Sequence, residues 1–360
     1  MAAPRLGLVG VGVLGARHAR VLAELARGPA APLAFAGLFD LNPARARAAA
    51  AEHGTVAHAS LDALLAASDG VLVVTPTVVH REVALAALAA GRDVFIEKPI
   101  ADSLAAADAI LASALANRRR VFVGHSERFN PAVRAAAAVV RPPRYIEARR
   151  LAGFSPRATD VDVVLDLMIH DIDLALALAG TAPTSVEAIG VAVLTDSEDL
   201  AHARLEFPSG AVASLTASRV SPERLRKLRV FSDHAYLSLD LLNGRAEAAF
   251  TDPKRLAEAA RAYAQHAAHA AGAVAAPPEA MPDWTGLLER RVLTVNDPSA
   301  QPLALELVAF AQALGTPDGE AAPAGDARFA LASGAVGRDA LAVACAVRDA
   351  MRARTARWPT

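Results

Sequence analysis

The chain has 360 residues, of which 54% are hydrophobic and 21% are charged, so its composition is that of a globular protein and not of a disordered one. A chain of this length is longer than a typical domain with one hydrophobic core, which predicts two domains. The formal net charge of −1 argues against a nucleic-acid surface, because phosphate binding needs a clear cationic excess. The single cysteine, Cys345, excludes an internal disulfide framework and a multi-thiolate metal site.

The N-terminus lacks the pattern of a secretory signal peptide, because Pro4 and Arg5 lead directly into a short apolar run that a glycine-rich turn ends. The sequence also lacks a run of about eighteen uninterrupted apolar residues, so we expect no membrane span. The expected location is the cytoplasm.

The first 123 residues alternate short apolar runs with Ala/Leu-rich stretches, and this part is predicted to be an α/β dinucleotide-binding (Rossmann) domain. The runs are nearly continuous, as expected for parallel strands that are covered on both faces. Asn42-Pro43 and Asp102-Ser103 carry residues that favour helix starts. The predicted strands are Leu6–Val9, Leu33–Phe39, Val71–Val74, Val94–Ile96 and Val121–Val123.

Residues 124–360 are predicted to form an α+β domain with a large, mostly antiparallel open sheet, which binds substrate and mediates oligomerisation. Helices are expected over Val163–Leu178, Leu303–Leu314 and Val336–Arg352, and a helix and loop over 253–284. The outer face of the sheet has no obvious helix to cover it, which predicts a homodimer or homotetramer. The predicted strands are Ser185–Val193, Ala201–Phe207, Val212–Ser218, Leu228–Phe231 and Tyr236–Leu239.

The turn Gly10-Val11-Gly12-Val13-Leu14-Gly15 follows the first predicted strand and precedes a helix, which is the setting of a dinucleotide site. Gly10 permits the tight turn, Gly12 lets the backbone approach a pyrophosphate, and Gly15 lets helix and strand pack closely. Together with Val13 and Leu14, these glycines are the predicted phosphate-binding residues. The alternative is a tight turn in an unrelated α/β domain. His18, on the following helix, is interpreted as structural or as a neighbour of the phosphates.

Asp40 ends the second predicted strand, where a carboxylate can accept hydrogen bonds from both ribose hydroxyls and would repel a 2′-phosphate. This position favours NAD over NADP. Arg45 and Arg47 follow within the next helix and are interpreted as too distant to bind a 2′-phosphate. The alternative for Asp40 is a capping residue at the strand end.

Two further polar clusters end predicted strands, at the sheet edge where an open α/β sheet binds its ligands. Thr75, Pro76 and His80 follow one strand, and Glu97 and Lys98 follow the next. All five are expected at the cofactor site, and a lysine there can act in acid–base chemistry. The alternative for Lys98 is an exposed loop lysine.

A third cluster places Asp166, His170 and Asp173 at spacings of i, i+4 and i+7, which is one face of a helix. Histidine can shuttle a proton near neutral pH, and a neighbouring carboxylate can orient its ring. The alternative is a metal site, but the spacing supplies no third strong ligand, so no metal site is predicted.

Taken in order, Gly10-x-Gly12-x-x-Gly15, Glu97-Lys98-Pro99 and Asp166-x-x-x-His170 resemble the glucose–fructose oxidoreductase, inositol dehydrogenase and rhizopine-catabolism (Gfo/Idh/MocA) family over essentially the whole chain. The resemblance implies an NAD-dependent dehydrogenase whose Lys98, Asp166 and His170 line the substrate pocket beside the nicotinamide. The glycine-rich lead that usually precedes the histidine helix is replaced by residues 160–164, Asp-Val-Asp-Val-Val.

A narrower resemblance concerns residues 124–131, Gly-His-Ser-Glu-Arg-Phe-Asn-Pro, and 159–163, Thr-Asp-Val-Asp-Val. Both resemble the nucleotide-sugar branch of the family, which includes UDP-N-acetylglucosamine 3-dehydrogenases of lipopolysaccharide and lipid A assembly. The resemblance implies oxidation of a UDP-sugar that contacts Arg128, Asn130 and Arg157, with Arg128 and Asn130 at the mouth of the pocket. Arg149 and Arg150 would add positive charge. The alternative for these arginines is that they are solvated surface groups. The alternatives are a dehydrogenase of a free polyol or monosaccharide, and a non-catalytic dinucleotide sensor.

Overall fold

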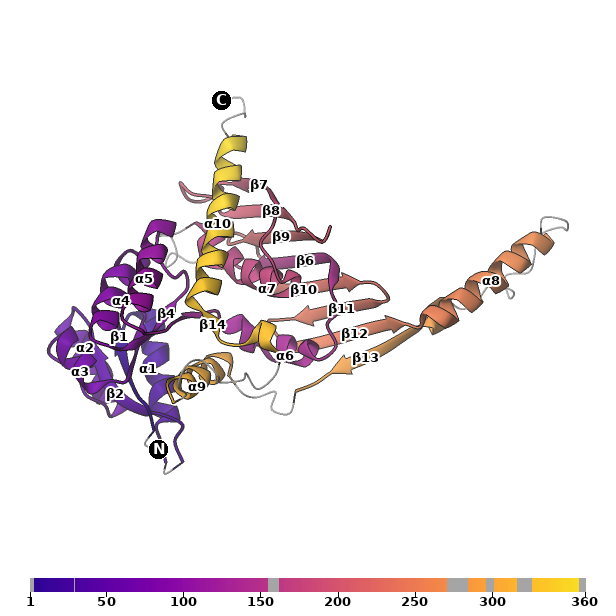
Figure 1. Ribbon diagram of the computed structural model, residues 1–360. Helices are drawn as coiled ribbons and strands as arrows, with labels where there is room; N and C mark the ends of the chain where they lie inside the picture. The colour runs from indigo at the N-terminus through magenta and orange to yellow at the C-terminus, as the bar shows by residue number, and fades with distance from the viewer. Residues whose placement is uncertain are drawn as a thin grey trace.

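The computed structural model describes residues 3–28, 30–154, 162–270, 284–295, 301–315 and 326–355. The chain forms two sheets that lie beside each other, with helices packed between them and around the first sheet (Figure 1). The predicted fold class, a Rossmann domain followed by an α+β domain with an open sheet, is confirmed.

The first sheet has six strands in the order β14-β5-β4-β3-β1-β2. Strands β1 to β5 are parallel, as their nearly continuous apolar sequences predicted, and β14 joins the edge antiparallel to β5. The strands are β1 Arg5–Val9, β2 Ala34–Phe39, β3 Gly70–Val73, β4 Asp93–Glu97, β5 Val121–Gly124 and β14 Ala332–Ser333.

The helices that connect these strands begin at the side chains predicted to start them. The Asn42 carboxamide oxygen accepts hydrogen bonds from the amides of Ala44 and Arg45, and the Ser103 hydroxyl accepts one from the amide of Ala106. The helices are α1 Val13–Leu25, α2 Pro43–His53, α3 Leu61–Ala67, α4 His80–Ala89 and α5 Leu104–Ala116.

The second sheet has eight strands in the order β13-β12-β11-β10-β6-β9-β8-β7, antiparallel except for the parallel pair of β6 and β9. Five strands match predicted ones, whereas β6, β12 and β13 were not predicted. Charged and alanine-rich sequences such as β12 favour a strand only through their neighbours in the sheet. The strands are β6 Pro143–Leu151, β7 Ser185–Val191, β8 Leu200–Glu206, β9 Val212–Ser218, β10 Leu225–Ser232, β11 Ala235–Asp240, β12 Arg245–Thr251 and β13 Leu288–Leu293.

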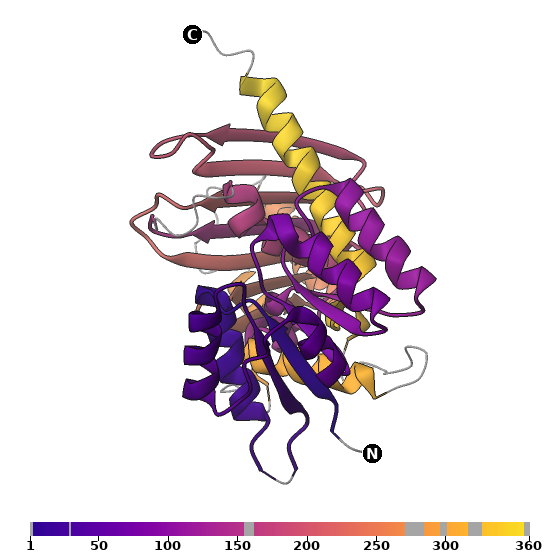
Figure 2. The ribbon, with the colours of Figure 1, turned by 90° about the vertical axis from the view of Figure 1, so that its left-hand side faces the viewer.

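One face of the second sheet is buried under helices, and in the described part of the chain the other face is not. The buried face carries small apolar residues such as Ala148, Ala203 and Leu215, each fully buried. Helix α10, Gly334–Thr355, lies between this sheet and α5 of the first domain (Figure 2). The other covering helices are α6 Pro131–Ala137 and α7 Ile169–Ala179.

The last part of the chain returns to the first domain. Helix α9, Pro302–Leu314, places Leu307 and Phe310 in the same core as Leu6 and Leu8 of β1. With β14, this helix completes the first sheet rather than the second. The predicted division into residues 1–123 and 124–360 therefore does not describe where this segment packs.

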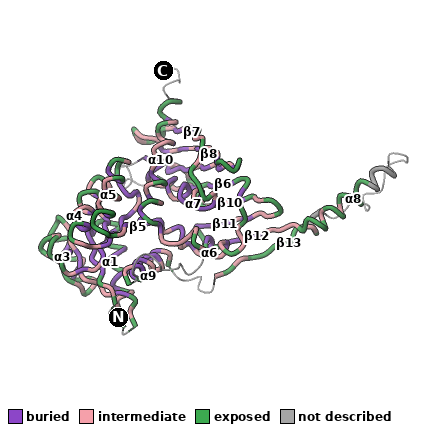
Figure 3. Tube along the Cα trace, in the orientation of Figure 1, coloured by how far each residue is buried: buried purple, intermediate pink, exposed green. Residues whose placement is uncertain are grey.

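Helix α8, Pro253–Ala270, extends away from the body between β12 and β13 (Figure 1). The helix predicted within 253–284 is therefore present between two strands. Its side chains as far as residue 264 are exposed or half-buried (Figure 3). Among the described elements, helix α8 contacts the short segment Trp284–Leu287 that precedes β13.

The start of the helix that carries Asp166 and His170 is anchored from two sides. The Asp162 carboxylate accepts the amides of Val164 and Leu165, and Arg348 of α10 lies 2.6 Å from its other oxygen. The helix begins as a π-helical turn, Val164–Met168, and continues as α7. Both partners of Asp162 restrict how this turn can move.

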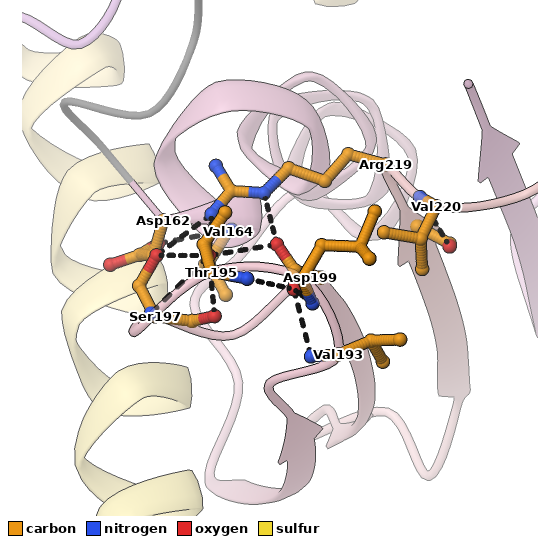
Figure 4. A network of polar contacts seen from close by, with 10 residues as sticks. Asp162, Val164, Val193, Thr195, Ser197, Asp199, Arg219 and Val220 are labelled. Atoms are coloured by element: carbon orange, nitrogen blue, oxygen red, sulfur yellow. Dashed lines mark hydrogen bonds and ion pairs between the residues drawn. The ribbon is translucent and has the colours of Figure 1, made fainter. Parts of the chain in front are cut away.

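The second anchor is a loop built around Asp199, which is fully buried (Figure 4). Its carboxylate accepts three main-chain amides, from Val193, Leu194 and Thr195, and pairs with Arg219 at 2.8 Å. The carbonyl of Glu198 in this loop accepts the amide of Val163, which joins the loop to the start of the helix. The network therefore restrains residues that precede the predicted catalytic side chains.

Candidate active site

The glycine turn between β1 and α1 has the shape that a dinucleotide pyrophosphate requires. A Cβ atom at Gly10 would lie 2.4 Å from the carbonyl oxygen of Val74, and one at Gly15 would lie 2.1 Å from that of Gly10. A Cβ at Gly12 would meet nothing within 4 Å, so this position faces open space. Val13 and Leu14 lie exposed in the first turn of α1, whose amides no side chain caps. The turn therefore fits a bound dinucleotide.

Asp40 holds the glycine turn as well as ending β2. One carboxylate oxygen accepts the amide of Val11 at 2.8 Å, and the other accepts the amide of Asn42 at 2.8 Å. Each oxygen retains a lone pair for a ribose hydroxyl. Arg45 lies with Nη1 3.7 Å from Asp40 Oδ2, so the expectation that Arg45 is too far along the helix to reach this corner is wrong. Helix α2 turns the arginine back toward the strand end.

His80 joins the two loops that follow β3 and β4. Its ring nitrogens each lie 3.0 Å from a main-chain carbonyl oxygen, that of Thr75 and that of Pro99. Burial lowers the pKa of His80. Both ring nitrogens face main-chain carbonyls, and the neutral ring can donate to one of them, so His80 links these two loops. Its contact with a cofactor stays a prediction. Of the other predicted residues here, Pro76 is exposed, and the buried Thr75 hydroxyl lacks a hydrogen-bond partner among the described residues.

Glu97 is a buried carboxylate at the end of β4. Its Oε1 lies 2.7 Å from His18 Nε2, and its Oε2 accepts the amide of Lys98. Burial alone would raise the pKa of Glu97, but the hydrogen bond and charge of His18, with Lys98 nearby, bring the pKa below its ordinary value. A Cβ at Gly124 would lie 3.0 Å from this carboxyl group, so a glycine there leaves room for it. Glu97 therefore helps to fix the backbone of Lys98. His18 positions Glu97, which is a structural role, one of the two predicted for it.

Lys98 and Asp166 are in contact across the two domains, and His170 follows about one helical turn after Asp166, near enough for the charge of Lys98 to act on it. The Lys98 Nζ donates to the main-chain carbonyl of Asp166 at 2.7 Å and lies 3.6 Å from its carboxylate. The acceptor belongs to the π-helical turn, a distortion that is frequent at functional sites. Burial lowers the pKa of His170 well below 6.5, and the charges of Lys98, Arg150, His125 and Arg226 lower it further. His170 is therefore a neutral imidazole beside cations.

Asp173 does not join this group, although it was predicted on the same helix face. Its two carboxylate oxygens accept Nε and Nη2 of Arg128 at 2.8 and 2.7 Å in the interior. Arg128 also donates to the carbonyls of Arg328 and Ala330. This guanidinium is only 5% exposed, so the predicted place of Arg128 at the pocket mouth is corrected to a structural ion pair.

Two further residues expected near the substrate, Asn130 and Arg150, have their polar groups paired inside the protein. Asn130 caps α6 and donates to Glu127 and to the carbonyl of Leu241, so its polar atoms are occupied inside the protein. Arg150 is buried and pairs with Asp171 at 2.8 Å and with Glu127 at 2.8 Å. Arg149 of the neighbouring position is exposed on the outer face. Arg157 lies outside the described residues.

Three polar residues near this site were not predicted. Arg226 lies beside Arg150 on the covered face of the second sheet. His125 is buried, and neither of its ring nitrogens has a hydrogen-bond partner in the described part of the chain. The Glu306 carboxyl of α9 is also buried and unpartnered there, and burial raises its pKa well above 4.5. Only the position of His125, directly after a strand, could have suggested it from sequence.

Among the described residues, no group of three His, Cys, Asp or Glu side chains is arranged to hold a metal ion. Nor is any described helix long and apolar enough to cross a membrane.

The chain matches known proteins over both domains. Residues 4–125 match the model of the oxidoreductase family with an NAD-binding Rossmann fold, and residues 132–238 match the GFO/IDH/MocA C-terminal domain. UDP-N-acetylglucosamine 3-dehydrogenase of Acidithiobacillus ferrooxidans is 44% identical over 240 residues, which are 66% of this chain and 74% of that protein. An inositol 2-dehydrogenase of Rhizobium meliloti is 31% identical over 60% of this chain and 68% of its own length.

Solved structures show the same fold. A crystal form of the Acidithiobacillus ferrooxidans UDP-N-acetylglucosamine 3-dehydrogenase superposes with a TM-score of 0.79 at 35% identity, covering 98% of this chain and 99% of that one. Levoglucosan dehydrogenase with NADH and levoglucosan is similar in fold alone, with a TM-score of 0.77 at 18% identity over 97% of each chain. With the glycine turn and the Lys98, Asp166 and His170 group in place, the chain belongs to the Gfo/Idh/MocA family of NAD-binding oxidoreductases.

Proposed function

We propose that this dehydrogenase oxidises a ring hydroxyl of a nucleotide sugar, the 3-hydroxyl of UDP-N-acetylglucosamine, with NAD as the cofactor. The observation that carries the proposal is the convergence of Lys98, Asp166 and His170 at the carboxyl end of the first sheet. Similarity to a UDP-N-acetylglucosamine 3-dehydrogenase supports the choice of substrate. A place in lipopolysaccharide or lipid A precursor synthesis and a cytoplasmic location follow from this substrate.

His170 is the proton acceptor in the proposed reaction. Its depressed pKa keeps the imidazole neutral, and a neutral imidazole can take the hydroxyl proton. Its Nδ1 is buried without a hydrogen-bond partner among the described residues, which leaves Nε2 to meet the substrate. A bound nicotinamide would supply the hydride acceptor.

Lys98 stabilises the negative charge that develops on the substrate oxygen as the proton leaves. The main-chain carbonyl of Asp166 at 2.7 Å and its carboxylate at 3.6 Å hold the ammonium in place. A charge fixed in advance in a partly desolvated site stabilises a transition state without reorganisation. Asp166 is therefore assigned to orienting Lys98 and the sugar.

NAD is proposed over NADP because the Asp40 carboxylate would face the ribose hydroxyls and repel a 2′-phosphate. The neighbouring Arg45, 3.7 Å away and half exposed, would otherwise attract that phosphate. In this proposal Asp40 accepts hydrogen bonds from the ribose hydroxyls and also neutralises the charge of Arg45.

The overall proposal is tested by turnover with a panel of substrates. The protein is mixed with NAD and, in separate reactions, UDP-N-acetylglucosamine, other UDP-sugars, inositols and hexoses, and the absorbance of reduced nicotinamide is followed. Turnover is expected with UDP-N-acetylglucosamine. Turnover with inositol or free hexoses alone would replace the proposed substrate, and turnover with none of them would favour a dinucleotide sensor.

His170→Ala is expected to lower kcat by about 100- to 10,000-fold, since it removes the general base. Lys98→Met should lower kcat by about 100-fold or more through lost charge stabilisation. Both variants should bind NAD as the wild type does, measured by calorimetry. Wild-type rates in both would contradict the assignment.

The acid limb of the kcat/KM profile is expected below pH 6.5, because a base with a depressed pKa becomes protonated only at lower pH. An acid limb at or above pH 6.5 would exclude His170 as the base.

Asp40→Asn retains a side-chain oxygen but removes the charge that opposes Arg45. This variant is expected to gain affinity for adenosine 2′,5′-bisphosphate at least tenfold, measured by calorimetry. Adding Arg45→Ala should abolish the gain, whereas Arg47→Ala, on the same helix, should not. Equal affinity in Asp40→Asn and the wild type would contradict the assignment of Asp40 and Arg45 to this corner.

The uncovered face of the second sheet and the unsupported helix α8 support a homodimer or homotetramer. Light scattering at micromolar concentration is expected to give a mass of two or four chains. A monomeric mass would rule the assembly out.

A further inference from the structure

Arg226 is the second residue of strand β10 and lies on the face of the second sheet that the helices cover. It pairs in register with Arg150 of β6, whose guanidinium reaches Asp171 of α7, directly after His170. The only described ion pair of Arg226 is with Glu127, also on the covered side. Its side chain is nonetheless 43% exposed. Arg226 is therefore a partly exposed cation on the covered side of the sheet, and its charge acts on the proposed base His170.

The hydrogen-bonding groups around Arg226 are already engaged. Its Nη1 lies 3.5 Å from Glu127 Oε1, and that oxygen accepts a shorter bond of 2.8 Å from Arg150. The other oxygen of Glu127 accepts from Asn130. Asp171 is held by two donors of Arg150. Arg226 consequently has one long contact for five N–H donors in the described part of the chain.

The charge of Arg226 is also poorly compensated. Burial lowers its pKa, and the neighbouring charge of Arg150 lowers it further, with Glu127 and Asp171 opposing this effect. An arginine whose charged form is disfavoured by its surroundings is stabilised by an anion that binds beside it. A planar guanidinium with free parallel donors matches the oxygens of a phosphate.

We propose that Arg226 binds a phosphate of the nucleotide-sugar substrate on the covered side of the second sheet, next to Arg150 and Glu127. The inference rests on the proposed function only for the class of substrate. It replaces Arg128, whose donors are committed to Asp173, as the arginine that recognises the anionic part of the ligand. An uncharged sugar or polyol carries no phosphate to pair with the charge of this arginine.

The test measures binding rather than turnover, with UDP and uridine as probes and calorimetry as the readout. Arg226→Met is expected to weaken UDP binding at least tenfold and to leave uridine binding unchanged, because only UDP carries phosphates. Arg226→Lys should restore part of the affinity through its charge. The matched control is Arg229→Met, because Arg229 lies on the same strand with its side chain paired to Glu147 on the opposite face. This control should bind UDP as the wild type does.

Equal UDP affinity in Arg226→Met and the wild type would overturn the inference, as would a wild type that binds UDP no better than uridine. A thermal melt of each variant shows whether the fold is retained, and Arg226→Lys carries the comparison if the methionine variant does not fold. The outcome is separable from the proposed function. UDP binding that depends on Arg226, without oxidation of any UDP-sugar, would reject the proposed reaction and support the phosphate site. Oxidation of a UDP-sugar with unchanged UDP affinity in Arg226→Met would support the reaction and reject the phosphate site.

Discussion

The contact between the Lys98 ammonium and the main-chain carbonyl of Asp166 is the constraint on which the site depends. Lys98 follows β4 of the first sheet, and Asp166 belongs to the π-helical turn before α7 in the second domain. The two residues are far apart in the sequence, and their distance is set by how the domains pack. Helix α10 maintains that packing, because it contacts α5 on one side and α7 on the other. The candidate site thus depends on the domain interface and is not formed by either domain alone.

The charged residues around α7 separate two tasks. Asp171 and Asp173 point into the protein and are neutralised by Arg150 and Arg128, which fixes the rotation and height of the helix. A buried pair of this kind adds little net stability, but breaking one costs about 3–5 kcal/mol. His170 directly precedes Asp171 in the chain and has no such ion pair among the described residues. The two ion pairs therefore hold the helix that carries His170 in one orientation.

The sequence predicted the parts of the site that local rules determine. The glycine turn, the strand ends that carry Asp40 and Lys98, and the helix that carries Asp166 and His170 follow from short patterns, and the structure has them. The partners of long side chains do not follow from such patterns. Nothing local indicates that Arg128 meets Asp173, or that α2 returns Arg45 to Asp40. Similarly, alanine-rich β12 is a strand only because β11 and β13 pair with it.

For the same reason, the sequence alone does not indicate a binding role for Arg226. Arg224, Arg226, Lys227 and Arg229 form a basic run, and a basic run usually indicates a solvated strand. Pairing in the sheet divides the run between two faces, so that Arg229 meets Glu147 on the outside while Arg226 meets the crowded Arg150 on the inside. Two residues of one type on one strand therefore differ in charge compensation. That difference, and not the abundance of arginine, is what separates an outer-face ion pair from a ligand-binding cation.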